Sequence, residues 1–151
     1  MYEKTLFAGW GDMDSNAHMR NTAFLDKSVD VRMMFFAESG FPMDELMRQR
    51  IGPVVMKDEV EYCKEVRLLQ PLRITLMLAG LAEDGSRFSI RNEIWREDGK
   101  LIARVTSTGG WLDLTTRKLI TPPESLLAAL RSLTPTGDFQ VLASSIKSIG
   151  V

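Results

Sequence analysis

The chain has little cysteine, no excess of charge of either sign and no long apolar stretch. Cys63 is the only cysteine among 151 residues, which excludes an intrachain disulfide and a metal site built from clustered thiolates. No histidine neighbours it in sequence, so we do not expect it to act as a nucleophile. The 19 Lys and Arg residues nearly balance 20 Asp and Glu, leaving a formal net charge of −1. This balance disfavours nucleic acid and anionic lipid as partners.

The sequence also shows no apolar segment of the kind that inserts into a membrane or directs secretion. The longest apolar run, Ile74 to Ala82, is interrupted by Thr75 and Gly80 and falls far short of the ~20 residues of a membrane-spanning helix. The first residues include Glu3 and Lys4 and lack the apolar core of a signal peptide. We therefore expect a soluble, cytoplasmic protein without membrane insertion.

The length bounds the number of domains. A chain of 151 residues buries about two-thirds of its unfolded surface, which is enough for a core without disulfides or metals. The sequence shows no internal repeat and no low-complexity segment. We expect residues 1–151 to form one domain, in which 134–151 is either an extra strand or a loose tail.

Apolar spacing predicts one long helix early in the chain. Asn21 is suited to be its N-cap, and Gly40 ends the pattern. The apolar positions between them are Leu25, Val29, Met33 and Phe36, with Phe24, Val31 and Phe35 beside them. This apolar surface is wider than a narrow stripe, as expected of a helix around which a sheet wraps. A shorter helix is expected within Pro42–Arg50.

The remaining pattern is mostly that of strands. A first strand is expected over Thr5–Trp10, and four longer ones follow the helix at Val54–Lys64, Arg73–Ala82, Arg87–Arg96 and Lys100–Leu114. The turns Glu83–Ser86 and Glu97–Lys100 have the composition of hairpins. Gly109-Gly110 marks a bulge or a close backbone approach, and Glu124–Leu133 a last helix. Together they predict an α+β fold with an antiparallel meander.

Two acids and the only histidine lie where the first strand gives way to the long helix. The run reads Asp12-Met13-Asp14-Ser15-Asn16-Ala17-His18-Met19-Arg20-Asn21-Thr22-Ala23-Phe24. An acid just ahead of a helix N-terminus lies beside unpaired backbone N–H groups, which favour negative charge and can stabilise an oxyanion. An acid there also serves as an ordinary cap of a helix or turn, so both roles remain open.

This run resembles the signature D-x-D-x-x-G-H-V-N-N-x-x-Y of hotdog-fold acyl-CoA thioesterases of the 4-hydroxybenzoyl-CoA thioesterase type, which ends in an arginine farther along. The matching residues are Asp12, Asp14, His18, Asn21 and Arg32, and Phe24 replaces Tyr. Ala17 stands in place of Gly, Met19 in place of Val and Arg20 in place of Asn. Ala17 is the important departure, because a Cβ is strained at a position with positive φ. The order of elements also fits the hotdog fold, a curled antiparallel sheet wrapped around a long central helix.

The resemblance implies roles for the residues of the run. Asp14 would attack the thioester or activate a water, while backbone N–H groups at the helix start, including that of Asn21, would hold the oxyanion. His18 would orient the substrate, bind the carbonyl or hold Asp14, and a purely structural histidine is the alternative. We expect Asp12 to act as a cap or to pair with a base such as Arg32.

The resemblance also places Ser86, Arg87 and Arg91 where related enzymes contact the nucleotide of CoA, whose phosphates need cations. Ordinary solvated arginines are the alternative. Hotdog active sites form between protomers, so the acids of the strand at Asp58–Glu61 would approach a partner's site, unless they are simply surface charge. An exposed edge strand also favours a partner.

We therefore expect an acyl-CoA thioesterase that uses neither a cofactor nor a metal and assembles as a homodimer or homotetramer. Hydrolysis of acyl groups carried by acyl carrier protein is an alternative. A non-catalytic acyl-CoA-binding or scaffold protein is another. Acyl specificity depends on how the pocket packs and does not follow from the sequence.

Overall fold

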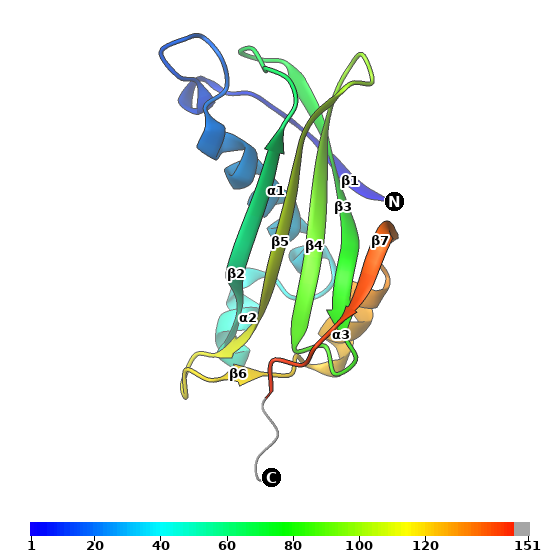
Figure 1. Ribbon diagram of the computed structural model, residues 1–151. Coiled ribbons are helices and arrows are strands. Elements are labelled where there is room, and N and C mark those ends of the chain that lie inside the picture. Colours follow the sequence, from blue (N-terminus) through cyan, green and yellow to red (C-terminus); the bar gives the residue numbers. More distant parts are fainter. Residues whose placement is uncertain (147–151) are drawn as a thin grey trace.

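The computed structural model describes residues 1–146, which form a curled sheet with a long helix lying across its concave side (Figure 1). In chain order the elements are β1 (Tyr2–Phe7), the 3₁₀ turn η1 (Trp10–Asp12), α1 (Asn21–Glu38), α2 (Met43–Gln49), β2 (Ile51–Tyr62), β3 (Pro71–Ala82), β4 (Arg87–Arg96), β5 (Leu101–Asp113), β6 (Leu119–Ile120), α3 (Glu124–Arg131) and β7 (Pro135–Leu142). The predicted α+β class is confirmed, and each predicted helix and strand has a counterpart.

The strand order differs from the predicted meander. It is β1-β3-β4-β5-β2, with β6 beside β5 and β7 beside β3. Only β3, β4 and β5 form a meander, because β2 pairs with β5 at the far edge of the sheet. The chain after β2 must cross the end of the sheet to reach β3. There Cys63 N–H donates to Ile102 O on β5 at 2.8 Å, and Leu69 N–H donates to Ala8 O at 2.7 Å.

The first strand begins and ends earlier than predicted. β1 covers Tyr2–Phe7 rather than Thr5–Trp10, with its even-numbered residues half-buried and its odd-numbered residues exposed. It pairs antiparallel with the first half of β3. Trp10 lies in η1 instead and is 83% exposed. The predicted range was based on the apolar and aromatic residues of Thr5–Trp10. The strand instead covers the residues that alternate between half-buried and exposed positions, Tyr2–Phe7.

One side of α1 is buried against the sheet. Its buried residues are Ala23, Phe24, Ser28, Val31, Arg32, Phe35 and Phe36. Phe36 meets the fully buried Trp111 of β5 edge to face, with ring centroids 5.7 Å apart. The predicted row of Leu25, Val29 and Met33 is only partly covered, and Val29 is 39% exposed. The helix is apolar on more than one side, so its spacing alone did not show which side the sheet covers.

The double glycine in β5 does mark a close backbone approach. A Cβ on Gly109 would lie 2.1 Å from the carbonyl oxygen of Val54 on β2. At the same level the register of β2 against β5 shifts between Val55 and Lys57, which leaves Met56 as an extra, bulged residue. Glycine and bulge together let the edge strand β2 bend closely over β5.

The end of the chain adds a strand to the sheet. β7 runs parallel to β3 along Leu78–Ala82, beyond the part of β3 that β1 covers. Of the two possibilities for 134–151, the extra strand is therefore present as far as Leu142. Residues 147–151, the last part of that expectation, lie outside the described residues.

Candidate active site

The segment between β1 and α1 folds into a compact loop around Asp14. Asp14 N–H donates to His18 O at 2.8 Å, and Met13 and Met19 pair as an isolated antiparallel bridge. Met19 N–H donates to the carbonyl of the buried Val66 at 2.8 Å. The loop is thus fixed by its own backbone and by the segment that follows β2.

The carboxylate of Asp14 is oriented by this loop. Its Oδ1 accepts hydrogen bonds from the N–H groups of Asn16 at 2.8 Å and His18 at 3.2 Å. This is the capping arrangement that the sequence left open as an alternative. Both bonds use one oxygen, and within residues 1–146 Oδ2 accepts no hydrogen bond. Asp14 can therefore cap the turn through Oδ1 while Oδ2 stays available to react with a substrate.

Ala17, the departure from the signature, adopts the conformation that favours glycine. Its φ is +63°, a left-handed value that is unfavourable by about 1–2 kcal/mol for a residue with a Cβ. Ala17 N–H donates to Asp14 O at 3.3 Å. The strained residue thus closes the turn that carries the acid.

We expect Ala17→Gly to raise the free energy of unfolding by up to about 1.5 kcal/mol. Relief of about 1–2 kcal/mol of strain is partly offset by about 0.4–1 kcal/mol from the greater freedom of unfolded glycine. The matched control is Ala37→Gly at an exposed position of α1, which should lower the free energy by about 1 kcal/mol. Urea unfolding measures both, and an equal loss in both variants would show that Ala17 is unstrained.

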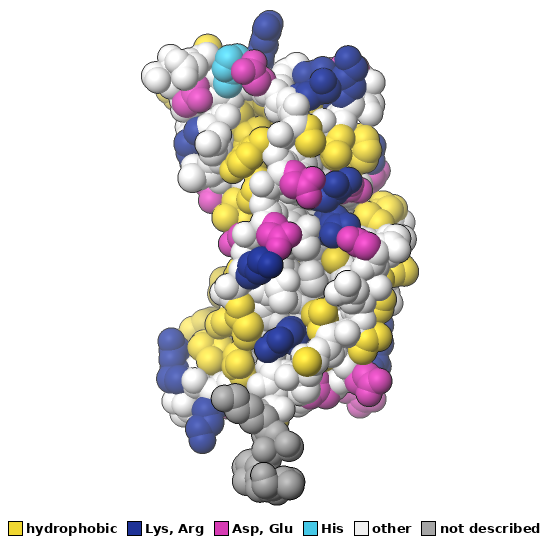
Figure 2. Space-filling view, in the orientation of Figure 1, with side chains coloured by type: hydrophobic (Ala, Val, Ile, Leu, Met, Phe, Trp, Pro, Cys, Tyr) yellow, Lys and Arg dark blue, Asp and Glu magenta, His cyan; other side chains and the backbone are white. Residues whose placement is uncertain are grey.

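His18 and Asn21 lie beside Asp14, although not in all the ways expected. His18 Nε2 lies 3.0 Å from Oε2 of Glu65, so its ring binds this acid and only its backbone holds Asp14. Figure 2 shows the histidine next to an acidic side chain at one end of the molecule. Asn21 is the first residue of α1 and not its N-cap, which is Arg20. The prediction of an Asn21 cap is wrong, because α1 begins one residue before the position that a cap at Asn21 requires.

The start of α1 is left without a side-chain cap. Arg20 makes no capping hydrogen bond, and the first turn contains no acidic residue. Of the first-turn N–H groups, that of Ala23 donates to Arg20 O at 3.0 Å. The N–H groups of Asn21 and Thr22 precede it and have no intrahelical acceptor. They are suited to an anion or a developing oxyanion.

One cavity of about 370 Å³ brings the three residues together. Its lining consists of Asp14, Asn16, His18, Met19, Asn21, Phe24, Tyr62, Cys63, Lys64 and Glu65. Tyr62 donates its hydroxyl hydrogen to Asn21 O at 3.2 Å and packs edge-on against Phe24, 5.4 Å between ring centroids. A second cavity of about 510 Å³ shares Asp14 and is lined otherwise by Trp10, Gly11, Met13, Ser15, Ala17 and Leu68. The acid lies where the two cavities meet.

The residues after β2 were missed as part of the site. Tyr62 and Lys64 fall within the strand expected at Val54–Lys64, and nothing in the sequence placed them or Glu65 near Asp14. These residues lie near Asp14 because the chain crosses the end of the sheet after β2. No local pattern in the sequence indicates that crossing. The single available signal was the break in alternation between Cys63 and Gln70.

The sequence model of the thioesterase-like superfamily matches residues 8–130. The chain belongs to this superfamily. This confirms the expected class, a thioester hydrolase. No curated protein sequence matches the chain.

Solved structures share the fold of this thioesterase-like chain. The hypothetical protein SAV2348 from Staphylococcus aureus, in complex with CoA, is 21% identical with a TM-score of 0.80, covering 89% of this chain and 86% of that one. The 1,4-dihydroxy-2-naphthoyl-CoA thioesterase Slr0204 from Synechocystis is 15% identical with a TM-score of 0.79, covering 87% and 96%. YbaW, a probable thioesterase from Escherichia coli, is 21% identical with a TM-score of 0.74, covering 89% and 99%. The predicted hotdog fold is confirmed.

In this superfamily member the first acid of the signature is structural. Asp12 Oδ2 lies 2.8 Å from Lys27 Nζ and accepts a hydrogen bond from Gly9 N–H at 2.7 Å. Burial acts to raise the pKa of Asp12, but these hydrogen bonds outweigh it and lower the pKa. The expected base Arg32 lies deeper, where its Nε donates to Asn92 Oδ1 at 2.8 Å and desolvation lowers its pKa to about 10. Asp12 thus pairs with a base as expected, but naming Arg32 was wrong.

The predicted CoA contacts lie away from the Asp14 cavity, toward the other end of the sheet. Ser86 and Arg87 lie at the start of β4, and Arg91 is midway along it. Tyr62, beside the Asp14 cavity, is level with Ile94 across β5. Seven residues of strand separate Ile94 from Arg87, about 23 Å at ~3.3 Å per residue. Within one chain, therefore, these residues do not share the cavity of Asp14.

The acids of β2 have partners within the chain. Asp58 accepts a hydrogen bond from Ser107. Glu59 Oε1 lies 2.6 Å from Lys57 Nζ, and Glu61 Oε2 lies 3.3 Å from Arg104 Nη1. Their side chains face solvent, as the surface-charge alternative requires. Among residues 1–146 no cluster of three or more potential metal ligands occurs, and no helix there is long and apolar enough to cross a membrane.

Proposed function

We propose that the chain hydrolyses acyl-CoA thioesters and that Asp14 is its nucleophile or general base. The observation that carries this proposal is the placement of Asp14. Its loop holds Oδ1 and leaves Oδ2 without a partner, and its cavity also contains the uncapped start of α1. A carboxylate oxygen and N–H donors on one cavity are the two groups that thioester cleavage needs.

The chemistry follows from these groups. Asp14 attacks the carbonyl carbon directly, or it removes a proton from a water that attacks in its place. The N–H group of Asn21, which lines the cavity, donates to the oxygen as negative charge develops on it. The C–S bond then breaks, and the CoA thiolate takes up a proton. In the direct route water afterwards cleaves the mixed anhydride formed with Asp14.

The proposed substrate has CoA as its carrier. The CoA complex of SAV2348 and the naming of Slr0204 as a CoA thioesterase support this choice. The second cavity offers Trp10, Met13 and Leu68 to the acyl part. These apolar side chains suit a hydrocarbon or aromatic group, while Asp14 lies at the mouth shared with the polar cavity.

The proposed assembly is a homodimer or a pair of such dimers. β2 is an edge strand, and the partly covered row of Leu25, Val29 and Met33 lies on the neighbouring helix. Arg87 is level with Val54 near the start of β2. Antiparallel pairing of two β2 edges would set the start of one strand beside the end of the other. It would thereby bring the Arg87 end of one protomer toward the Asp14 cavity of its partner.

The test is a thiol-release assay over short, long and aromatic acyl-CoAs, with matched acyl groups on acyl carrier protein. We expect steady release of free CoA and slower release from the carrier protein. Faster release from the carrier protein would favour the acyl-carrier alternative. Saturable binding of acyl-CoA without thiol release would instead favour the non-catalytic binding protein. The cytoplasmic location remains a prediction.

A further inference from the structure

The last described residues cross the outer face of the sheet. We call residues 135–146, which comprise β7 and the described residues after it, the C-terminal strap. In Figure 1 the strap runs along β3 and then passes the lower end of β4. β7 thus lies at the edge of the sheet beside Arg91, and the residues after it reach Ser86 and Arg87. These are the three side chains that the sequence assigned to CoA binding.

All three of those side chains bind the strap. Arg91 donates from Nη1 and Nη2 to the two carboxylate oxygens of Asp138, at 2.9 and 3.1 Å. Ser86 Oγ lies 3.1 Å from Ser144 Oγ and accepts a hydrogen bond from the backbone of Ser145 at 2.8 Å. Arg87 Nε donates to Ser145 Oγ at 3.3 Å. The strap thus satisfies polar groups that would otherwise face solvent or a ligand.

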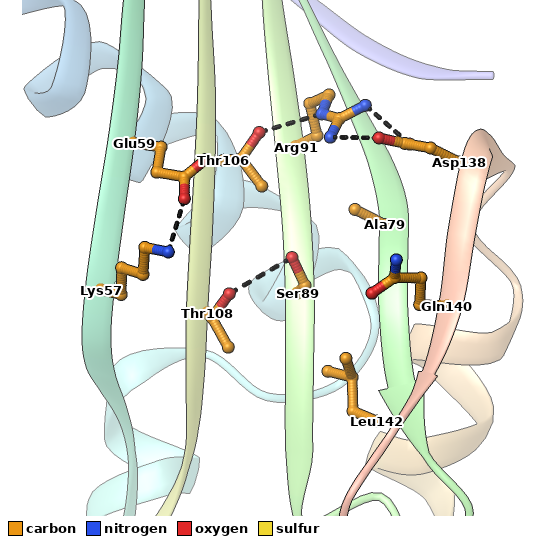
Figure 3. A pocket seen from close by; sticks show the side chains of 10 residues that line it. All are labelled: Lys57, Glu59, Ala79, Ser89, Arg91, Thr106, Thr108, Asp138, Gln140 and Leu142. Carbon is orange, nitrogen blue, oxygen red and sulfur yellow. Dashed lines mark hydrogen bonds and ion pairs between the residues drawn. The ribbon is translucent and has the colours of Figure 1, made fainter.

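Asp138 also forms one wall of a polar hollow of about 190 Å³ (Figure 3). Arg91 and Lys57 supply two cations to its lining, and Ser89, Thr106 and Thr108 supply hydroxyl groups. Each cation is paired inside the hollow, Arg91 with Asp138 and Lys57 with Glu59 at 2.6 Å. The hollow is therefore built from donors whose positive charge is neutralised by the chain itself.

The two-point contact on Arg91 indicates which ligand would fit. A guanidinium group presents the same fork of N–H donors to a carboxylate and to a phosphate. Arg91 also donates from Nε to Thr106 Oγ1 at 2.9 Å, which fixes the plane of the fork. A phosphate in the position of the Asp138 carboxylate would have Lys57 and the hydroxyl groups of the hollow close by.

Most of the strap is exposed, and Asp138 lies in its exposed part. Six of the eight residues of β7 are exposed, and only Thr136 is buried. Its pairing with β3 is interrupted between Leu78 and Gly80. Exposed ion pairs contribute about 0–1 kcal/mol each. Moving Asp138 away from Arg91 would therefore expose little apolar surface.

We propose that this hollow is a phosphate-binding site and that the C-terminal strap is its built-in competitor. Asp138 occupies on Arg91 the position that a phosphate group takes when the strap shifts. The inference rests on the proposed function only for the source of the phosphate, the nucleotide end of CoA. Free inorganic phosphate shares the chemistry and is separated by experiment.

The test is the dissociation constant of CoA, measured by calorimetry, for the full chain and for Asp138→Asn. Removing the competing charge should tighten CoA binding by about 2- to 5-fold, the worth of one exposed ion pair. The matched control is Asp98→Asn. Asp98 also binds an arginine at two points, because Arg96 donates to it from Nε at 3.1 Å and from Nη2 at 2.8 Å, in the turn at the far end of β4. This control should leave CoA binding unchanged.

Further ligands and variants identify the group that is bound. The gain in affinity caused by Asp138→Asn should be absent when pantetheine, which lacks the nucleotide, replaces CoA. It should also disappear when Arg91→Gln is added to Asp138→Asn. If Asp138→Asn tightened the binding of inorganic phosphate as much as that of CoA, the hollow would still be a phosphate site. Its ligand would then be free phosphate and not the nucleotide end of CoA. Equal CoA affinity in Asp138→Asn and the unaltered chain would overturn the proposal.

Hydrogen exchange tests the movement of the strap separately. Saturating CoA should speed amide exchange across residues 137–146 while leaving that of β4 unchanged or slower. Slower exchange of the strap would mean that CoA adds to the closed arrangement, against the proposal. Neither CoA affinity nor hydrogen exchange depends on turnover, so both test the strap even if the chain releases no thiol. A negative result in either would leave the proposed role of Asp14 unaffected.

Discussion

Asp14→Asn is expected to lower the turnover of acyl-CoA by about 10²- to 10⁴-fold. The amide retains an Oδ1 that accepts the hydrogen bonds from Asn16 and His18, so the loop should keep its shape. It has no basic oxygen with which to attack a carbonyl or remove a proton. The variant should therefore unfold at the same temperature and bind CoA with the same affinity as the unaltered chain. Steady-state thiol release and thermal unfolding are the measurements.

The control for this prediction is Asp12→Asn in the same loop. Asp12 binds Lys27 and the backbone of Gly9, so its loss should reduce stability while leaving the rate per folded molecule within about 10-fold. Because the folded pKa of Asp12 is lowered, its contribution is present above its unfolded pKa and is lost as the pH falls through the folded pKa. If Asp14→Asn kept full turnover, Asp14 would be only a cap.

Gly109→Ala is expected to lower the free energy of unfolding by about 3 kcal/mol, the upper end of the usual penalty for overpacking. The added carbon would lie 2.1 Å from the backbone oxygen of Val54, and backbone cannot rotate away as a side chain can. Either the bulged strand β2 separates from β5 or the sheet flattens, and overpacking of this kind is strongly destabilising. Urea unfolding at equal protein concentration measures the loss.

Gly52→Ala provides the comparison within the same pair of strands. Its Cβ would meet only Leu114 Cδ2 at 3.6 Å, an ordinary contact. We expect a change below about 1 kcal/mol for this variant. Similar stabilities for the alanine variants of Gly109 and Gly52 would mean that the two strands can move apart without penalty.

Local patterns in the sequence predicted most elements of the fold and the core of the site. Spacing of apolar residues located α1, and the turn compositions located the hairpins on either side of β4. Asp14, His18 and Asn21 come together because they belong to one short segment, which chain connectivity alone keeps compact. A signature of consecutive residues is informative for the same reason.

The errors concern relations between distant segments. Alternation shows which residues of a strand share a face but not which strand lies beside it, so β2 was placed next to β3. The partner of Asp12 depended on how far along α1 each base lies. Lys27 reaches the loop, whereas Arg32 lies about 16 Å from the helix start at 1.5 Å per residue. Glu65 reaches His18 only through the crossing after β2.

The edge shared by β1 and β7 limits how copies of the chain can aggregate. β1 is six residues long and carries Glu3 and Lys4, which pair with Arg73 and Glu38. β2, at the opposite side, is twelve residues long. Charged, short edges resist strand addition, and an endless ribbon needs two receptive sides on every copy. With a single receptive edge, extension of the sheet stops after two chains, and any pairing of such dimers must use another face, so the protein should stay dispersed at concentrations where a sheet open on both sides would form fibres.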